Sequence, residues 1–250
     1  MAQADDHWPK IVPILFDVHR PFHDARAWGI MLQVLEWLGP RLSAIAIGGD
    51  FADAYNISQY PKSPMVGKLF QDEVHSVDQG IRQLEYFKVP IGYYAGNHEH
   101  RLERKFPELC GVLSWDRLLT LSERGIKWID FDAHQGHKLY NSNLWIKHVP
   151  ETEGKYPATF TAERTGLSFV TGHVHRFQIY YVKFFDRLVK CYSSGFLGDI
   201  RSGVFDYVKG FHKWHLGFLI ATIEKDGSFT VDPVSIENNQ TIFWGKTFRG

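Results

Sequence analysis

The sequence predicts an α/β fold built from two β-sheets and flanking helices. In the first hundred residues, short apolar runs alternate with longer segments whose apolar residues recur at helical spacing, as in strand–helix–strand units. In the second half, short β-like runs separated by turn residues dominate. Because no Pro-, Gly- or Ser-rich linker divides the halves, we expect one domain over residues 1–250.

Three apolar runs in the first half are expected to form central strands, at residues 11–16, 44–47 and 89–94. A helix is expected after the first run, with Asp24 as its N-cap and Gly39-Pro40 as its end. The apolar residues that recur at helical spacing in it are Trp28, Met31, Leu35 and Leu38.

A second, longer helix is expected before the third run. Ser63 is the expected N-cap and Pro64 the first helical residue, a position that suits proline. One apolar stripe, expected to face the core, consists of Val66, Phe70, Val74, Val77, Ile81, Leu84 and Phe87.

The second half is expected to hold one helix, at 113–124, followed by strands. Turns that suit hairpins are Phe185-Asp186-Arg187 and Lys225-Asp226-Gly227. The expected strands are 126–131, 143–148, 167–171, 178–184, 187–193, 215–224 and 228–236.

Composition narrows the classes of function. Lys plus Arg (28) equals Asp plus Glu (28), so bulk charge does not indicate a nucleic acid or an anionic membrane as partner. Cys110 and Cys191 form no CxxC pair, which argues against a disulfide framework and a thiolate zinc site. The first residues do not resemble a secretory signal, and no apolar run is long enough to span a bilayer. We therefore expect a cytoplasmic protein with no membrane partner; its oligomeric state is left open.

Polar residues with the chemistry of metal ligands follow five of the apolar runs. Because the carboxyl ends of parallel strands meet at one edge of a sheet, we expect these side chains to converge. They are Asp17 and His19, Asp50, Asn97 and His98, His148, and His173 and His175. Carboxylate, imidazole and amide donors without a thiolate suit Mn²⁺, Fe, Zn²⁺ or Ni²⁺. Their number exceeds what one ion takes, which predicts a pair of metal ions.

These residues form an ordered series of motifs: DxH at 17–19, GDxxD at 49–53, GNHE at 96–99, a lone His148, and GHxH at 172–175. The series resembles that of the calcineurin-like metallophosphoesterases, of the small phage and bacterial type, and extends over about two thirds of the chain. The resemblance implies a four-layer αββα sandwich of two mixed β-sheets flanked by helices. It also implies hydrolysis of phosphoesters by a hydroxide that bridges two metal ions.

The resemblance further implies a role for each residue of the series. The first metal would be held by Asp17, His19 and His175, the second by Asn97, His148 and His173, and Asp50 would bridge them. His98 would be a catalytic residue that binds no metal and acts as acid or anion stabiliser. Asp53 and Glu99 would orient His or Asn ligands.

One ligand departs from the family's pattern. The family usually has Gly after the lone His, whereas Val149-Pro150 follows His148 here. His134 and His137 are therefore alternative ligands.

Three arginines are candidates for binding substrate. Arg101 and Arg104 follow GNHE on a short predicted helix, where a salt bridge with Glu103 or Glu108 is the alternative. Arg201 lies in the Gly- and aromatic-rich segment 196–215, which is either a packed loop or a substrate-recognition lip.

The function expected from the sequence is hydrolysis of phosphodiesters by a metal-dependent hydrolase. The expected cofactor is a pair of di- or trivalent metal ions. Mn²⁺ is expected to support activity in vitro, and Fe, Zn²⁺ or Ni²⁺ are the alternatives. The expected substrate is a small phosphodiester or a nucleotide, with nucleic acid as a further alternative. The rival functions are a phosphomonoesterase, a DNA exonuclease of the same superfamily, and a non-catalytic interaction scaffold on the same fold.

Overall fold

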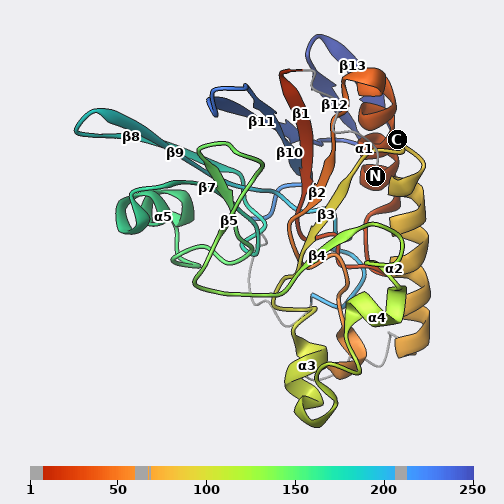
Figure 1. The fold of residues 1–250 in the computed structure, drawn as a ribbon. Coiled ribbons are helices and arrows are strands. Elements are labelled where there is room, and N and C mark those ends of the chain that lie inside the picture. Colours follow the sequence, from red (N-terminus) through yellow and green to blue (C-terminus); the bar gives the residue numbers. More distant parts are fainter. Residues whose placement is uncertain (1–7, 60–66, 68, 206–212) are drawn as a thin grey trace.

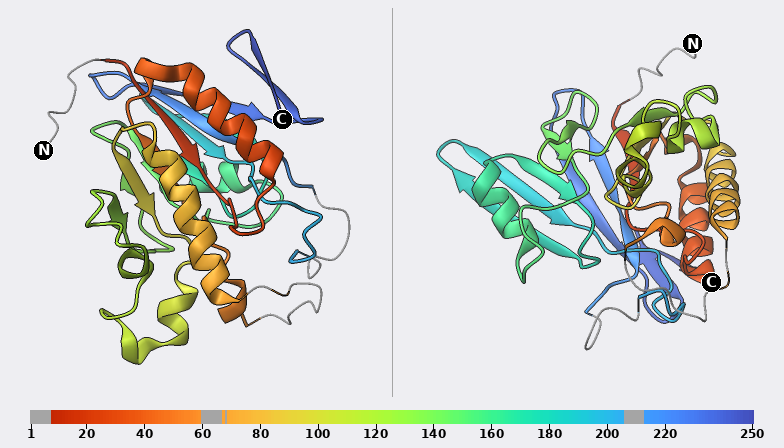
Figure 2. Two further views of the ribbon diagram at one scale, coloured as in Figure 1. Left: turned by 90° about the vertical axis from the view of Figure 1, so that its right-hand side faces the viewer. Right: turned by 90° about the horizontal axis from the view of Figure 1, so that it is seen from below.

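A computed structural model describes residues 8–59, 67, 69–205 and 213–250 (Figure 1). Two mixed β-sheets lie face to face, and helices cover the outer face of each sheet (Figure 2). The fold is therefore the α/β sandwich that the sequence predicts.

The larger sheet has six strands in the order β11-β10-β1-β2-β3-β4. Strands β1 to β4 are parallel, whereas β10 and β11 pair antiparallel with their neighbours. The strands span Lys10–Leu15 (β1), Ile45–Ile47 (β2), Ile91–Tyr94 (β3), Lys127–Ile129 (β4), Gly217–Ile223 (β10) and Phe229–Ser235 (β11).

The smaller sheet has five strands in the order β5-β6-β7-β9-β8. Its three central strands are parallel, and the two edge strands are antiparallel to them. The strands span His137–Lys138 (β5), Leu144–Ile146 (β6), Ser168–Thr171 (β7), Gln178–Phe184 (β8) and Arg187–Ser193 (β9). A separate hairpin of β12 (Gln240–Phe243) and β13 (Lys246–Arg249) contacts the helix α1.

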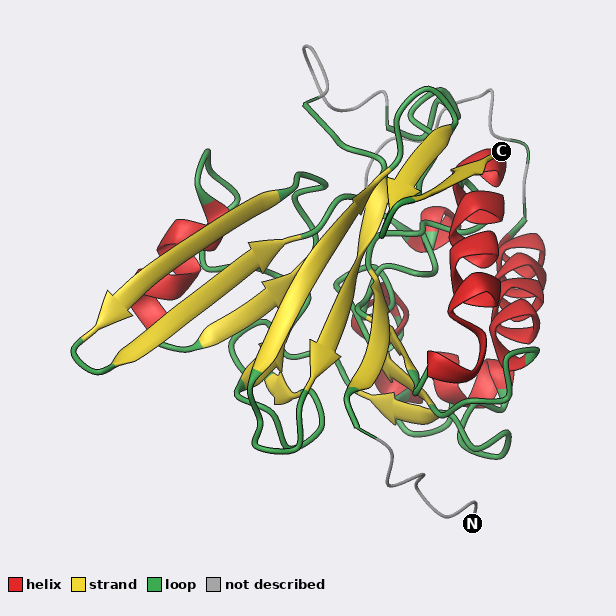
Figure 3. Ribbon diagram, turned by 90° about the horizontal axis from the view of Figure 1, so that it is seen from above, coloured by secondary structure: helices red, strands yellow, loops and turns green. Residues whose placement is uncertain are grey.

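Helices lie on both outer faces of the two sheets, as Figure 3 shows. The long helices α1 (Ala25–Leu38) and α2 (Phe70–Glu85) pack on the six-stranded sheet, and α5 (Pro157–Thr165) packs on the other. The short helices α3 (Arg101–Lys105) and α4 (Trp115–Leu119) follow β3. Single turns of 3₁₀ helix span Gly39–Arg41 (η1), Tyr55–Ile57 (η2) and Pro107–Leu109 (η3).

The alternation of side chains along a strand divides the core into layers. In β1, Ile11 and Leu15 pack against the helices, whereas Val12 and Ile14 face the second sheet. The second sheet contributes Ile146 and other apolar residues to the layer between the sheets. Each sheet is therefore buried on both faces at its centre, which explains its short, almost wholly apolar strands.

Most of the predicted elements are present, with shifted ends. Asp24 caps α1 as expected, because its carboxylate accepts hydrogen bonds from the amides of Arg26 and Ala27. Helix α2 begins only at Phe70, where Asp72 accepts the Leu69 amide; the expected cap at Ser63-Pro64 lies outside the described residues.

The helix predicted at 113–124 is shorter than expected. It covers only Trp115–Leu119, because Thr120 adopts a left-handed backbone (φ 50°) that ends it. Both predicted hairpin turns are confirmed, between β8 and β9 and between β10 and β11.

Within the described part of the chain, no helix is both long and apolar enough to cross a lipid bilayer.

Candidate metal centre

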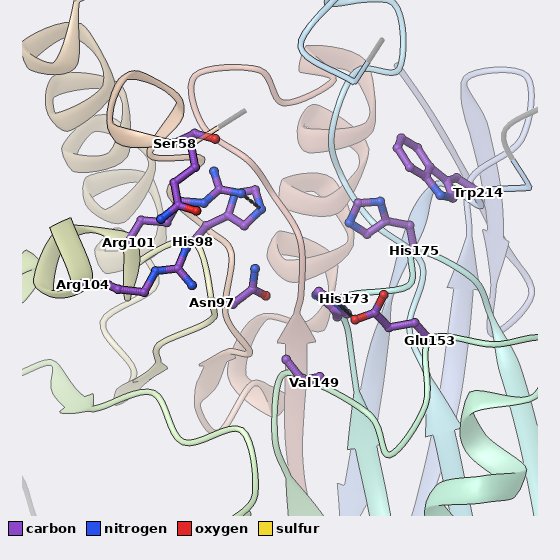
Figure 4. Close-up of a pocket in the computed structure, with 11 residues that line it drawn as sticks. Ser58, Asn97, His98, Arg101, Arg104, Val149, Glu153, His173, His175 and Trp214 are labelled. Carbon is purple, nitrogen blue, oxygen red and sulfur yellow. Dashed lines mark hydrogen bonds and ion pairs between the residues drawn. The ribbon is translucent and has the colours of Figure 1, made fainter. Parts of the chain in front are cut away.

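The predicted ligands lie together at one edge of the sandwich, and Figure 4 shows Asn97, His173 and His175 among them. Asp17, Asp50 and Asn97 follow the ends of β1, β2 and β3, which are parallel neighbours. His148 and His173 follow β6 and β7, which are parallel neighbours in the second sheet. The centre therefore joins the two sheets.

One group of donors consists of Asp17, His19 and His175. Asp17 Oδ1 lies 3.3 Å from His175 Nε2 and 3.8 Å from His19 Nε2, and the two Nε2 atoms are 3.2 Å apart. Ligands about 2.0–2.2 Å from a single ion have spacings of this size. All three side chains are buried.

A second group consists of Asp50, His148 and His173. His148 Nε2 lies 3.0 Å from Asp50 Oδ2, and its Nδ1 faces the Gly48 carbonyl oxygen at 3.1 Å. Because Nδ1 donates a hydrogen bond to that carbonyl, Nε2 is the ring nitrogen that can coordinate an ion at the centre. In the described residues neither alternative, His134 or His137, belongs to a donor group.

Several buried polar atoms at this centre make no hydrogen bond with the described protein: Asp17 Oδ1, Asn97 Oδ1 and His148 Nε2. Buried polar atoms without a hydrogen-bond partner are rare in folded proteins, because each costs roughly 1–3 kcal/mol. Bound cations would satisfy all three. The residues present therefore fit a metal centre, although they fix neither the identity nor the number of the ions.

The electrostatics of the centre suit a cation. Burial opposes the ionisation of Asp50, but the facing His148 outweighs it and holds the pKa of the carboxyl well below its usual range. Burial likewise opposes a charge on His148, yet Asp50 and Asp17 raise the pKa of its ring to about 9. In the absence of an ion His148 therefore holds a proton, which a metal would displace.

His98 lies next to these groups, but protein atoms engage both of its ring nitrogens. Nδ1 is 2.7 Å from the Asp53 carbonyl oxygen, and Nε2 is 2.7 Å from Nη2 of Arg101. Since a guanidinium only donates hydrogen bonds, Nε2 is the acceptor and the ring is neutral. Burial lowers the pKa of His98 to about 3, in accord with this state. One group of possible donors includes His98 with His19 and Asp50, yet no ring nitrogen of His98 is free for an ion.

The two supporting carboxylates act differently from each other. Asp53 Oδ2 lies 2.9 Å from His19 Nδ1 and so holds that ring with Nε2 toward Asp17. The expectation that Glu99 orients a His or Asn ligand is wrong. Its carboxylate accepts hydrogen bonds from the Tyr93 hydroxyl and from three backbone amides, those of Asp50, Ala52 and Gly96. Glu99 therefore fixes the loop backbone around Asp50.

The backbone at the expected ligands is unusual. Asp17 (φ 54°), His19 (53°), Asp50 (51°), His173 (69°) and His175 (56°) all adopt the left-handed conformation. This conformation is uncommon outside glycine and costs of order 1–3 kcal/mol, so it persists mainly where the surroundings impose it, often at functional sites. The turns direct side chains from separate strands toward one point.

Glycines of the motifs leave room for the ligands. A Cβ atom on Gly96 would lie 2.1 Å from Asp50 Oδ1, and one on Gly49 would lie 2.6 Å from His148 Nδ1. Only a residue without a side chain allows this close approach. The glycine in GNHE is therefore needed for the position of Asp50.

A cavity of about 750 Å³ opens beside the centre and holds three of the expected ligands, Asn97, His173 and His175, in its wall. Arg101 and Arg104 also line it, together with His98. Figure 4 shows Arg104, Arg101 and His98 on one side of Asn97, and His173 with Glu153 on the other. Among the described residues that line the cavity, sequence reasoning missed Ser58, Gln59, Val149, Glu153 and Trp214.

The third candidate arginine, Arg201, does not line this cavity. Its guanidinium pairs with Asp199 and Asp24, 2.9 and 3.4 Å away. In the segment 196–215, the rings of Phe196 and Phe205 are buried, and Phe196 stacks on His175. The described part of this segment is thus largely a packed loop, and residues 206–212 lie outside the described residues.

Comparison with models of known protein families and with curated protein sequences finds no match for this chain. The donor residues of the centre are therefore what indicates a function.

Proposed function

We propose that the protein is a phosphoesterase of the calcineurin-like type that uses two metal ions to hydrolyse phosphodiesters. One observation carries the proposal: Asp50 lies between two groups of donors. Its carboxylate groups with His148 and His173 on one side and with His19, which also groups with Asp17 and His175, on the other. An arrangement with one shared carboxylate is typical of two-metal hydrolases that act at phosphorus. The buried atoms without partners in both groups support it further.

Asp17, His19 and His175 would hold one ion, Asn97, His148 and His173 the other, and Asp50 both. Bound there, the ions would supply Lewis acidity, which lowers the pKa of water and neutralises charge on phosphoryl oxygens. The protein itself would supply a positive charge beside the phosphoryl group. Because the geometry at His98 is that of a neutral ring, this charge would come from Arg101, whose guanidinium contacts His98 Nε2.

The proposal is tested by kinetics on metal-reconstituted protein. With Mn²⁺ bound, we expect a higher kcat/KM for bis(4-nitrophenyl) phosphate than for 4-nitrophenyl phosphate. The reverse order would favour a phosphomonoesterase. If two ions bind and neither ester is hydrolysed, the proposal is wrong and a non-catalytic scaffold becomes the better account.

A further inference from the structure

The two arginines in the cavity wall differ in what they contact. Nη2 of Arg101 lies 2.7 Å from His98 Nε2, and Nη1 donates to the Asp53 carbonyl oxygen at 2.8 Å. The side chain of Arg101 is also only 10% exposed. Arg101 is therefore held in place by the protein on both sides of its guanidinium.

Arg104, one turn further along α3, is exposed and lies beside Asn97 in the cavity wall (Figure 4). Its backbone amide bonds to the His100 carbonyl at 3.0 Å, but its guanidinium has no hydrogen bond or ion pair with any described residue. The neighbouring Glu103 is no partner, since its carboxylate contacts the His100 ring at 3.0 Å.

The only carboxylate among the described residues lining the cavity is that of Glu153, which contacts His173 Nε2 at 3.1 Å. Figure 4 shows Glu153 on the side opposite Arg104. The guanidinium of Arg104 therefore has five N–H donors, and none of them is bonded to an acceptor of the described residues. A planar guanidinium of this kind is well suited to bind phosphate or carboxylate oxygens.

We propose that Arg104 binds an anionic group of the substrate and selects phosphoesters that carry a second negative charge. This inference rests on the proposed function. The single charge of a simple phosphodiester would lie at the metal ions, so a separate guanidinium provides for an additional charge. A cavity of about 750 Å³ also exceeds the size of one phosphate, which leaves room for a charged substituent.

Two different groups can carry the second charge, and rates on suitable substrates distinguish them. This charge is either that of a further phosphate on the ester substituent or the second charge of a monoester's phosphoryl group. The substrates are thymidine 5′-(4-nitrophenyl phosphate) with and without a 3′-phosphate, 4-nitrophenyl phosphate, and bis(4-nitrophenyl) phosphate as a reference without additional charge.

Arg104→Gln is the test variant, and Lys105→Gln is its matched control. Lys105 is exposed on the same helix but does not line the cavity. We expect Arg104→Gln to lower kcat/KM for the 3′-phosphorylated diester by about tenfold or more, because charge-assisted hydrogen bonds are lost. For bis(4-nitrophenyl) phosphate the change should stay within about twofold, and Lys105→Gln should leave both values unchanged. A loss on 4-nitrophenyl phosphate instead would assign the charge to the phosphoryl group itself.

An equal loss on all four esters, or no loss on any, would overturn the role of Arg104. Failure of the proposed function looks different, because wild-type protein would then hydrolyse none of the esters. In that case, calorimetric titration of the same three proteins with thymidine 3′,5′-bisphosphate decides the question. Weaker binding by Arg104→Gln alone supports the inference, and equal binding by all three proteins contradicts it.

Discussion

Asp50 and His98 lie beside each other but differ in how the protein engages them. Asp50 Oδ1 accepts the His98 amide at 2.9 Å, while Oδ2 faces His148 Nε2. Asp50 is thus held by the loop of GNHE and still presents an oxygen to the centre. In His98, by contrast, both ring nitrogens are bonded to protein atoms. The two residues should therefore respond differently to substitution.

We expect Asp50→Asn to lose bound metal and to lower kcat by at least about a hundredfold, because the shared negative charge is removed. His98→Ala should keep its metal content and lose activity only. Metal analysis after gel filtration, combined with rates on bis(4-nitrophenyl) phosphate, measures both. Full metal content in Asp50→Asn would refute its shared role, and loss of ions from His98→Ala would make His98 a ligand.

At this scale the sequence predicts which donor residues converge better than it predicts what surrounds them. Asp17, Asp50 and His148 lie within three residues of the ends of apolar strands, so the sheet edge brings them together. Val149 and Trp214 line the cavity because of the paths that their loops take. The local sequence pattern does not predict such paths. The role of Glu99 depends on a close approach between two loops, which spacing within one motif does not reveal.

At the scale of elements, α2 supports the loop that follows Asp50. The buried Glu73 of α2 accepts hydrogen bonds from the backbone and side-chain amides of Asn56, at 3.0 and 2.8 Å. Its second oxygen, Oε2, makes no hydrogen bond with the described residues. Burial raises the pKa of Glu73 from 4.5 to about 7. The native protein therefore binds a proton here more tightly than the unfolded chain does.

The consequence is a cost of folding at higher pH. Below about pH 4.5, Glu73 is protonated in both the native and the unfolded state. Between pH 4.5 and about 7, Glu73 is ionised in the unfolded chain but still protonated in the native protein. The free energy of unfolding therefore falls as pH rises through this range. The full effect is of order 3 kcal/mol, from about 1.4 kcal/mol per pKa unit. Glu73→Gln should therefore gain stability relative to wild type at pH 8 but not at pH 4.5.

Thermal unfolding in the presence of a chelator measures this difference. Glu36→Gln, an exposed change on α1, is the control and should show no such dependence on pH. If the difference between Glu73→Gln and wild type is the same at both pH values, the carboxyl of Glu73 is not protonated in the folded state.

The elements that the sequence predicts well are those with strong local signals. The Asp24 cap and the turn at Lys225-Asp226-Gly227 fix their elements within a few residues. The hairpin of β12 and β13 was not predicted, although Trp244-Gly245 is a turn with positive φ at both residues. It is held by tertiary contacts, in which Trp37 of α1 packs against Phe243 and Phe248. Contacts between distant segments are not visible in local periodicity.

At the scale of the whole molecule, the centre lies across the two sheets. Asp17 and Asp50 follow strands of the six-stranded sheet, whereas His148 and His175 follow strands of the five-stranded one. Ions bound there would connect the sheets in the native state only, and ligands of the native state raise its stability by mass action.

Removal of metal should therefore lower the melting temperature. At about a hundredfold excess of metal over Kd the stabilisation is about 2.7 kcal/mol, which corresponds to roughly 5–10 °C for a domain of this size. Differential scanning fluorimetry with Mn²⁺ and with chelator measures it. Asp50→Asn should respond much less than wild type. Equal melting temperatures of wild type under both conditions, with ions shown to be bound, would mean that the unfolded chain binds the ions as tightly as the native state does, which contradicts a centre that only folding assembles.

The left-handed turns at Asp17, His19, Asp50, His173 and His175 limit how this centre can be re-engineered. A replacement must coordinate the desired ion and also tolerate positive φ, a combination met by few amino acids besides Asp, Asn and His. β-Branched residues fail the second condition. Attempts to change which ion the proposed centre would take are therefore better directed at Asn97 and His148, which are not among the left-handed residues.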